Sequence, residues 1–327
     1  MKALILGVGG QDGSYLAEFL LERGYEVHGV VRRNSVPEHQ ESRVSHLAQD
    51  ISTYYGDMTD FPTMMRLLDD IGPDEIYNLA AQSHVRVSFD IPTYTGEVNA
   101  LAVAGLLEAV RLQAPMVRLY QASSSEMFGT SVDADGYQRE STPMHPASPY
   151  GCAKLYAYHM VRTYRDAYGL FAANGILFNH ESPRRGSNFV TNKIVQGVVR
   201  ISLGRQDELR LGNLDSYRDW GHSADYVRAM HMMLQHPLPG DFVISTGETR
   251  SVRDLCAIAF GLVGLEYRDY VVQDPRYLRA KEVPMLRGDS SKARAELGWT
   301  PRYTFEHLIE EMLEAAFARE SRPRRDP

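Results

Sequence analysis

The chain has 327 residues, of which 43% are hydrophobic and 24% charged, a composition typical of folded globular proteins and not of disordered or fibrous ones. Its 42 acidic residues outnumber its 35 basic residues, and the formal net charge of −7 disfavours sequence-independent binding to a nucleic-acid backbone. The 2 cysteines are too few for a disulfide scaffold or a cysteine-rich zinc site. We therefore expect a cytoplasmic protein with no metal, no nucleic-acid partner and no membrane partner.

The first elements in the chain form a strand–helix–strand unit. Residues 3–6 are a continuous apolar run, which is typical of a strand buried on both faces. Glycines follow, and apolar residues at helical spacing from Leu16 onward predict a helix that ends at Gly24. Residues 26–33 complete the unit as a second strand.

The same alternation continues along the first half of the chain. It predicts strands over 75–79, 118–122 and 175–178, with helices over 98–111 and 149–168. Such repetition predicts an α/β fold with a doubly wound parallel (Rossmann) sheet, covered by helices on both faces.

The regular alternation of predicted strands and helices stops after residue 178, where Arg-, Asn- and Gly-rich loops separate short elements. We expect residues 179–320 to form mainly a smaller α/β substrate-binding region, with 213–250 returning to the domain formed by 1–178. An amphipathic helix is predicted over 304–317, and residues 321–327 are expected to be a frayed tail.

Glycines at positions 7, 10 and 13 follow the first predicted strand. Gly7, Gly10 and Gly13 permit a tight turn, close approach of the backbone to a pyrophosphate, and close packing of the next helix. The start of that helix, with Gln11 and Asp12, points unpaired N–H groups at the phosphates. The position between strand and helix favours a dinucleotide site over a glycine-rich turn without a ligand.

The end of the second strand indicates which dinucleotide is bound. An acidic residue there would take the ribose 2′-hydroxyl of NAD, but the chain has Arg32 and Arg33. Guanidinium groups bind a 2′-phosphate, so the sequence favours NADP, against the alternative of a solvated basic loop end.

Tyr150 and Lys154 lie four residues apart and so on one face of a predicted helix. A tyrosine with a pKa near 10 is a poor base at neutral pH, and we expect the ammonium group to lower that pKa. Ser124, Ser125 and Glu126 follow the strand that ends near residue 122, where ligands bind in such sheets. The serines could equally serve the turn and Glu126 could face solvent, but an added carboxylate suggests a second proton transfer.

These features together resemble the extended short-chain dehydrogenase/reductase superfamily and, within it, the GDP-mannose 4,6-dehydratase family over nearly the whole chain. The resemblance is carried by residues 10–16, 77–83, 121–126, 148–151, 178–186, 212–215 and 218–221. The run Asn-His-Glu-Ser-Pro-Arg-Arg-Gly at 179–186 is the most specific of them.

The resemblance implies that GDP-mannose is oxidised at carbon 4, that water is lost across carbons 5 and 6, and that the hydride returns to carbon 6. It assigns Tyr150 as base, Glu126 to the carbon 5 proton, and Ser124 with Ser125 as hydroxyls. The implied cofactor contacts, beyond the glycine loop and Arg32–Arg33, are Asp57, Met58, Leu79, Ala80, Ala81, Gln82, Ser83, Tyr94, Lys154, His180 and Arg185. The implied substrate contacts are Ser83, Asn179, Lys193, Arg218, Arg279 and Glu282.

The chain departs from the family in a few positions. Ser124 stands where a threonine is usual, Gly9 also replaces a threonine, and residues 279–282 read Arg-Ala-Lys-Glu in place of Arg-Pro-x-Glu. The family uses the Arg32–Arg33 loop across a subunit boundary, which implies a homodimer or homotetramer.

Three other functions share some of these sequence features. A reductase of the 4-keto product shares the fold but would consume NADPH in equal amounts. Another NDP-hexose dehydratase or epimerase is disfavoured, because the dTDP-glucose enzymes usually have Asp where Ser125 stands. A cofactor-sensing regulator would be expected to lose Tyr150 or Lys154, and both are present.

Overall fold

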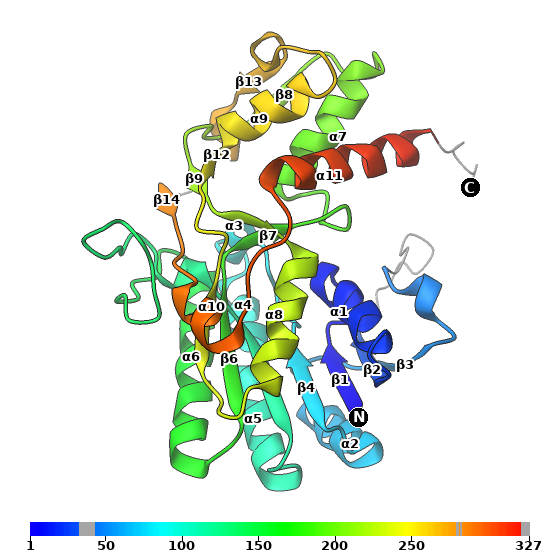
Figure 1. The fold of residues 1–327 in the computed structure, drawn as a ribbon, viewed down its shortest axis with the longest axis vertical. Helices are drawn as coiled ribbons and strands as arrows, with labels where there is room; N and C mark the ends of the chain where they lie inside the picture. Colours follow the sequence, from blue (N-terminus) through cyan, green and yellow to red (C-terminus); the bar gives the residue numbers. More distant parts are fainter. Residues whose placement is uncertain (33–42, 279–280, 282, 322–327) are drawn as a thin grey trace.

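The structure is a computed structural model and describes residues 1–32, 43–278, 281 and 283–321 (Figure 1). Its centre is a seven-stranded sheet in the order β11-β6-β5-β4-β1-β2-β3, with every neighbouring pair parallel. The doubly wound parallel sheet expected from the sequence is confirmed. The strands are β1 (Lys2–Leu6), β2 (Glu26–Val31), β3 (Ile51–Tyr55), β4 (Glu75–Asn78), β5 (Arg118–Ser124), β6 (Ala172–Leu177) and β11 (Asp241–Ile244).

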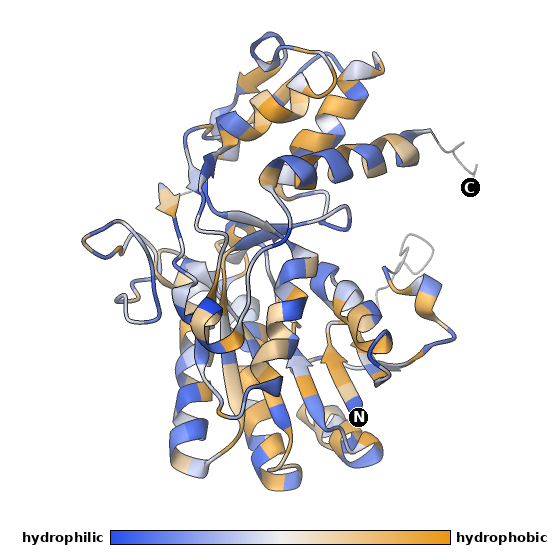
Figure 2. Ribbon diagram, in the orientation of Figure 1, coloured by the Kyte–Doolittle hydropathy of each residue, from blue (hydrophilic) through white to orange (hydrophobic). Residues whose placement is uncertain are grey.

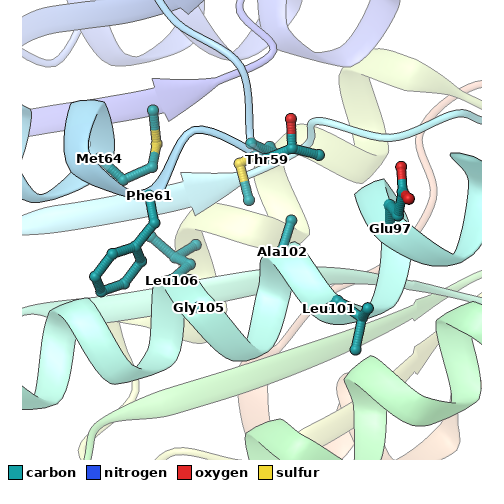
Figure 3. A pocket seen from close by; sticks show the side chains of 9 residues that line it. Thr59, Phe61, Met64, Glu97, Leu101, Ala102, Gly105 and Leu106 are labelled. Carbon is teal, nitrogen blue, oxygen red and sulfur yellow. The ribbon is translucent and has the colours of Figure 1, made fainter.

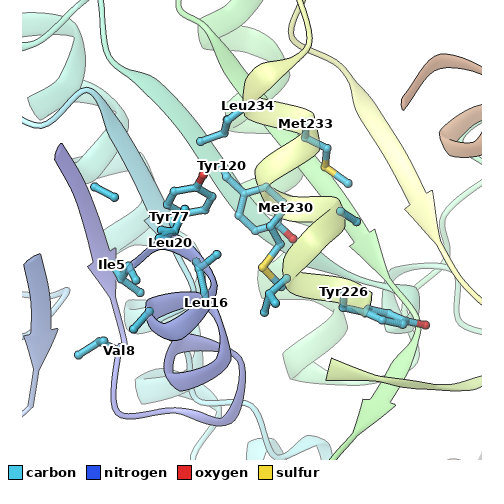
Figure 4. Close-up of a cluster of buried hydrophobic side chains, with 14 of the residues drawn as sticks. Ile5, Val8, Leu16, Leu20, Tyr77, Tyr120, Tyr226, Met230, Met233 and Leu234 are labelled. Carbon is cyan, nitrogen blue, oxygen red and sulfur yellow. The ribbon is translucent and has the colours of Figure 1, made fainter. Parts of the chain in front are cut away.

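Alternating side chains of the strands bury against helices on the two faces of the sheet. On one face, Ala3 and Ile5 of β1 pack with α1 (Gln11–Leu21) and α8 (Ser223–Gln235), as the close-up in Figure 4 shows for Ile5, Leu16 and Met230. On the other face, Leu4 and Leu6 pack in a second cluster with α2, α5 and α6. These helices span Phe61–Ile71, Ala102–Gln113 and Pro149–Tyr168.

The hydropathy of the ribbon follows from this layering. In Figure 2, β1 is largely hydrophobic, whereas α5 and α6 carry hydrophilic residues as well as hydrophobic ones, because only one side of each helix meets the sheet. Among the described residues, we find no helix with the length and apolar character needed to cross a bilayer.

A smaller region lies beyond the carboxyl ends of the strands, in the upper part of Figure 1. Its apolar core is formed by α7 (Val190–Ser202), α9 (Val252–Gly261) and α11 (Phe305–Glu320), with Trp220 stacked on Phe305 at 5.5 Å between ring centroids. Its strands are β7 (Asn179–Glu181), β8 (Leu209–Leu211), β9 (Tyr217–Arg218), β10 (Trp220–His222), β12 (Arg250–Ser251), β13 (Val271–Gln273) and β14 (Met285–Leu286).

The short elements connect these parts. They are η2 (Ser45–Leu47), α3 (Val85–Ser88), α4 (Pro92–Gly96), the π-helix η3 (Glu97–Leu101), η4 (Ser125–Met127), η5 (Tyr267–Asp269), η6 (Pro275–Tyr277) and α10 (Ser291–Leu297). Helix α8 and strand β11 carry residues 223–244 back to the main sheet, where β11 pairs with β6.

Several element limits differ from those expected. The strand expected at 175–178 begins at Ala172, because residues 172–174 pair with β5 although alanine and asparagine have little strand preference. The helix expected at 98–111 begins as the π-helix η3 and continues as α5 to Gln113. The second strand ends at Val31, not at 33. Arg33 and the tail residues 322–327 lie outside the described residues.

Candidate active site

The glycine loop between β1 and α1 requires glycine for geometric reasons. Gly7 has φ = +88°, and a Cβ atom there would lie 3.0 Å from the backbone N of Ala80. A Cβ atom on Gly13 would lie 2.4 Å from the carbonyl oxygen of Gly7, so α1 can approach the loop only with glycine there.

A cavity of about 320 Å³ opens in front of the glycine loop, at the carboxyl ends of β1, β2 and β4. This is where a doubly wound sheet binds its ligand. The predicted cofactor residues that line it are Gly7, Gly10, Gln11, Asp12, Gly13, Arg32, Asp57, Met58, Leu79, Ala80, Ala81, Ser83, Tyr94 and Arg185. Its other lining residues are Leu6, Val30, Gly56 and Val98, which sequence reasoning missed because small and apolar side chains carry no chemical signal.

A partly buried ion pair joins the start of α1 to β7. Nε2 of His180 lies 2.8 Å from Oδ2 of Asp12, and Nδ1 of His180 lies 2.7 Å from the carbonyl oxygen of Phe178. Burial is the largest single influence on both groups and favours their neutral forms. The partner's charge and the hydrogen bonds together outweigh it, so the pKa of His180 is raised and that of Asp12 is lowered. His180 is not a lining residue of the cavity; it reaches the glycine loop through Asp12.

Two further pairs lie at the part of the cavity next to the end of β2. A guanidinium nitrogen of Arg32 donates a hydrogen bond to the hydroxyl of Tyr94. The carboxylate of Asp57 accepts hydrogen bonds from the backbone and hydroxyl of Thr59, and despite partial burial its pKa is lowered. These contacts hold a guanidinium group at the rim, where a 2′-phosphate could be recognised.

Gln82 serves the loop after β4 and does not line the cavity. Its backbone N–H donates to Oδ1 of Asn99 at 2.8 Å, and Nδ2 of Asn99 donates back to the carbonyl oxygen of Gln82 at 2.8 Å. Its side-chain amide donates to the hydroxyl of Thr95 at 3.1 Å. Through these hydrogen bonds, Gln82 stabilises the loop that carries Ala81 and Ser83.

Tyr150 and Lys154 both lie in the first part of α6, buried to 8% and 4% exposure. The Tyr150 hydroxyl is hydrogen-bonded to Ser124, which ends β5. Nζ of Lys154 donates to the carbonyl oxygen of Ala122 at 2.8 Å and lies 5.8 Å from the centroid of the Tyr150 ring.

The expected lowering of the Tyr150 pKa is wrong. Burial raises the pKa of Tyr150 to about 12, although the hydrogen bond from Ser124 and the charge of Arg185 act in the opposite direction. Burial also lowers the pKa of Lys154 to about 8. Burial is therefore the largest cause of both pKa shifts.

The three serines around the end of β5 have different surroundings. Ser124 accepts a hydrogen bond from the backbone N–H of Glu126 at 3.2 Å and so begins the short helix η4. Ser123 instead donates to Oδ1 of Asn174 at 3.1 Å, which is a sheet contact. Ser125 and Glu126 are both buried next to Ser124. A residue that sequence reasoning missed, Ser88 of α3, accepts from the backbone N–H of Tyr150 at 3.2 Å.

The predicted substrate residues come from separate elements of the smaller region. Asn179 begins β7, directly before His180. Nζ of Lys193, in α7, donates to the carbonyl oxygen of Arg210 at 2.6 Å and lies 3.5 Å from the centroid of the Tyr277 ring. Arg218, in β9, is buried. Arg279 and Glu282 lie outside the described residues.

Arg185 lies between the two groups of predicted residues. It lines the cofactor cavity, and its Nε atom is 2.9 Å from Oε2 of the buried Glu181. Burial raises the pKa of Glu181, while the charge of Arg185 lowers it. The pair fixes a positive group at the inner end of the cavity.

A second cavity of about 340 Å³ lies between α2 and the η3–α5 segment (Figure 3). Its lining is mostly apolar, including Phe61, Met64 and Leu101, and it shares only Met58 with the cofactor cavity. None of the predicted catalytic residues line it, so it is not part of the candidate active site.

Comparisons with known proteins find relatives over nearly the whole chain. A family model described as GDP-mannose 4,6 dehydratase matches residues 4–312. GDP-mannose 4,6 dehydratase 1 of Arabidopsis thaliana is 50% identical over 324 residues, covering 95% of this chain and 88% of that protein. The Homo sapiens GDP-mannose 4,6 dehydratase is 47% identical over 338 residues, covering 96% and 90%. The solved structure of dTDP-glucose 4,6-dehydratase from Bacillus anthracis in complex with NAD has a TM-score of 0.85 at 22% identity, covering 98% and 97%, a likeness of fold.

Proposed function

The chain belongs to the GDP-mannose 4,6-dehydratase family, and we propose from that premise that it converts GDP-D-mannose to GDP-4-keto-6-deoxy-D-mannose and water. The observation that carries the proposal is the juxtaposition of Tyr150, Ser124 and Glu126 at the end of β5, at the same carboxyl edge of the sheet as the cavity in front of the glycine loop. The family match favours this activity over the reductase, epimerase and regulator alternatives.

A nicotinamide cofactor is supported by the glycine cradle and the cavity, and we propose that it is NADP. The glycine loop leaves room for a pyrophosphate, the N-terminus of α1 points at it, and Arg32 lies at the rim for a 2′-phosphate. Arg33, its predicted partner in this role, lies outside the described residues. When bound, the cofactor supplies a hydride acceptor for carbon 4 and a hydride donor for carbon 6.

The chain's own residues move the protons. Tyr150 takes the proton of the carbon 4 hydroxyl, with Ser124 hydrogen-bonded to its phenol oxygen and Lys154 next to it in α6. The resulting carbonyl acidifies the carbon 5 proton, which Glu126 removes and passes to the carbon 6 hydroxyl, so that this group leaves as water. When the hydride returns to carbon 6, carbon 5 takes up a proton from solvent through Glu126, which balances the proton that Tyr150 took from the carbon 4 hydroxyl and releases. Glu126 follows β5, and Tyr150 of α6 is hydrogen-bonded to Ser124 at the end of that strand, so one bound hexose can contact both groups.

The remaining expectations complete the proposal. Residues 1–178, with 213–250, hold the cofactor, and 179–320 hold mainly the sugar nucleotide through Asn179, Lys193 and Arg218. The Arg218 guanidinium suits a diphosphate. We further propose a cytoplasmic homodimer or homotetramer.

Incubation with GDP-mannose and a trace of NADP tests the proposal. We expect a product lighter by the mass of one water molecule, many turnovers per cofactor and no net NADPH formation or loss. Consumption of NADPH in equal amounts would instead identify a reductase, and no change in the sugar nucleotide would refute the proposal.

A further inference from the structure

A buried carboxylate that the proposed chemistry does not use lies between β9 and β10. Asp219 is 0% exposed, and its Oδ1 atom accepts from the backbone N–H and the hydroxyl of Thr246 at 2.8 and 2.7 Å. Its Oδ2 atom accepts from the backbone N–H of Gly247 at 2.8 Å, and the backbone N–H of Gly288 also donates to the carboxylate. Asp219 thus gathers donors from two distant segments.

The two segments belong to different parts of the fold. Thr246 and Gly247 follow β11, the edge strand of the main sheet, and Gly288 follows β14 of the smaller region. A Cβ atom on Gly288 would lie 2.4 Å from Cβ of Ser245, so the segments are in close contact. Asp219 therefore ties the end of the main sheet to the smaller region.

The residue before Asp219 is the predicted substrate contact Arg218. Strand β9 is the middle strand of the sheet β12-β9-β14, and Arg218 pairs with Arg250 on one side and Leu286 on the other. The donors to Asp219 come from the segments just before β12 and just after β14. The Asp219 carboxylate consequently holds, by hydrogen bonds, the segments that adjoin β12 and β14, the two strands on either side of Arg218.

The choice of aspartate has a physical reason. Burial raises the pKa of Asp219 to about 6, although the hydrogen bonds it accepts lower it. A neutral asparagine would avoid that cost of burying a charge, but one of its two polar atoms is a donor and would face a donor here. Only an acceptor-only group satisfies both segments.

We propose that Asp219 is a positioning residue that fixes the backbone of Arg218 and so sets the affinity for the nucleotide diphosphate of the substrate. This inference rests on the proposed function, which places Arg218 at the sugar nucleotide. Asp219 does not contact the reacting atoms, and the cofactor cavity lies on other strands, so neither the chemical step nor cofactor binding depends on it directly.

Calorimetric titration of GDP and of NADPH into D219N tests the inference. We expect the dissociation constant for GDP to rise about tenfold, as for loss of hydrogen bonds to a charged group, with that for NADPH unchanged. In steady state, KM for GDP-mannose should rise with kcat little affected. Unchanged GDP affinity, or an equal loss of affinity for NADPH, would overturn the inference.

If D219N does not fold, a pair of variants at Thr246 tests the inference instead. T246V removes one donor to Asp219 and should weaken GDP binding about threefold, whereas T246S keeps the hydroxyl and should bind GDP as the unsubstituted chain does. Equal GDP affinity in T246V and T246S would overturn the inference. An unsubstituted chain that binds GDP but does not convert GDP-mannose would contradict the proposed function alone, and one that binds no GDP would contradict both.

Discussion

The imidazole of His180 and the carboxylate of Asp12 form a partly buried ion pair, with 2.8 Å between Nε2 and Oδ2. The pair joins the first strand–helix unit to the strand that opens the smaller region. Asp12 lines the cofactor cavity in the first turn of α1, where a carboxylate would repel a bound pyrophosphate. His180 offsets that charge without lining the cavity. The pair thereby connects cofactor binding to β7, whose first residue is the predicted substrate contact Asn179.

Replacement of His180 by alanine should weaken NADPH binding about tenfold, because Asp12 then keeps an unpaired negative charge beside the phosphates. The double variant H180A/D12N should recover most of the affinity, since the repelling charge is gone. Titration of NADPH fluorescence measures both. Equal dissociation constants for H180A and the unsubstituted chain would show that the pair does not face the cofactor.

The same ion pair predicts how cofactor affinity depends on pH. The pKa of His180 is raised in the folded chain, so its positive charge is present at low pH and is lost as the pH rises through that raised pKa. We expect NADPH affinity to fall over that range in the unsubstituted chain and to fall less in H180A/D12N. Parallel pH profiles for the two proteins would contradict the assignment.

Replacement of Glu126 by glutamine should stop loss of water and leave the first oxidation possible. Glutamine keeps the shape of the side chain but cannot accept the carbon 5 proton, and such a loss slows a reaction about 10²- to 10⁴-fold. With stoichiometric NADP, E126Q should form NADPH up to one equivalent per site and no 6-deoxy product. Formation of 6-deoxy product at the original rate would exclude Glu126 as the base.

Replacement of Tyr150 by phenylalanine should abolish the first oxidation while retaining GDP-mannose and NADPH binding. The ring still fills the buried position, but the hydroxyl that is hydrogen-bonded to Ser124 is missing. A rate loss of at least about 10² is expected in single-turnover NADPH formation. S124A, which removes only the supporting hydroxyl, should lose less. Full turnover by Y150F would rule out this role for Tyr150.

Replacement of Lys154 by methionine should change how stability depends on pH. The folded pKa of Lys154, about 8, lies below the ordinary value of 10.5, so the unfolded chain holds more protons between these values. The free energy of unfolding of the cofactor-free, unsubstituted chain should therefore rise by about 2 kcal/mol relative to K154M between pH 8 and pH 10. Urea titrations measure this difference, and a difference independent of pH would contradict the burial of a charged Lys154.

The central sheet could be predicted because local patterns and strand pairing agree. The apolar run of β1 and the glycines before α1 are read directly from neighbouring residues, and the structure has them where expected. Strand β3 and the start of β6 at Ala172 could not be read in this way. Their pairing with β2 and β5 is set by contacts between distant residues, not by their own side chains.

The residues of the candidate site also differ in whether local sequence patterns indicate them. Residues with a chemical signal in a motif, such as Tyr150 and Lys154, can be proposed from the sequence. Ser88, which accepts from the Tyr150 backbone, and Asn99, which holds the loop at Gln82, were missed because one serine or asparagine has no distinguishing neighbours. The predicted direction of the Tyr150 pKa shift is wrong, because that direction depends on burial. The spacing of residues in the sequence does not show how deeply a side chain is buried.

The transfer of hydrogen within a single sugar ring tests the central claim most directly. GDP-mannose carrying deuterium at carbon 4 is converted in ordinary water, and unlabelled substrate is converted in deuterated water. The account predicts that the first label moves to the methyl group at carbon 6 of the same molecule and that solvent deuterium enters at carbon 5. Loss of the carbon 4 label to solvent or to the NADPH pool, with no label at carbon 6, would contradict it.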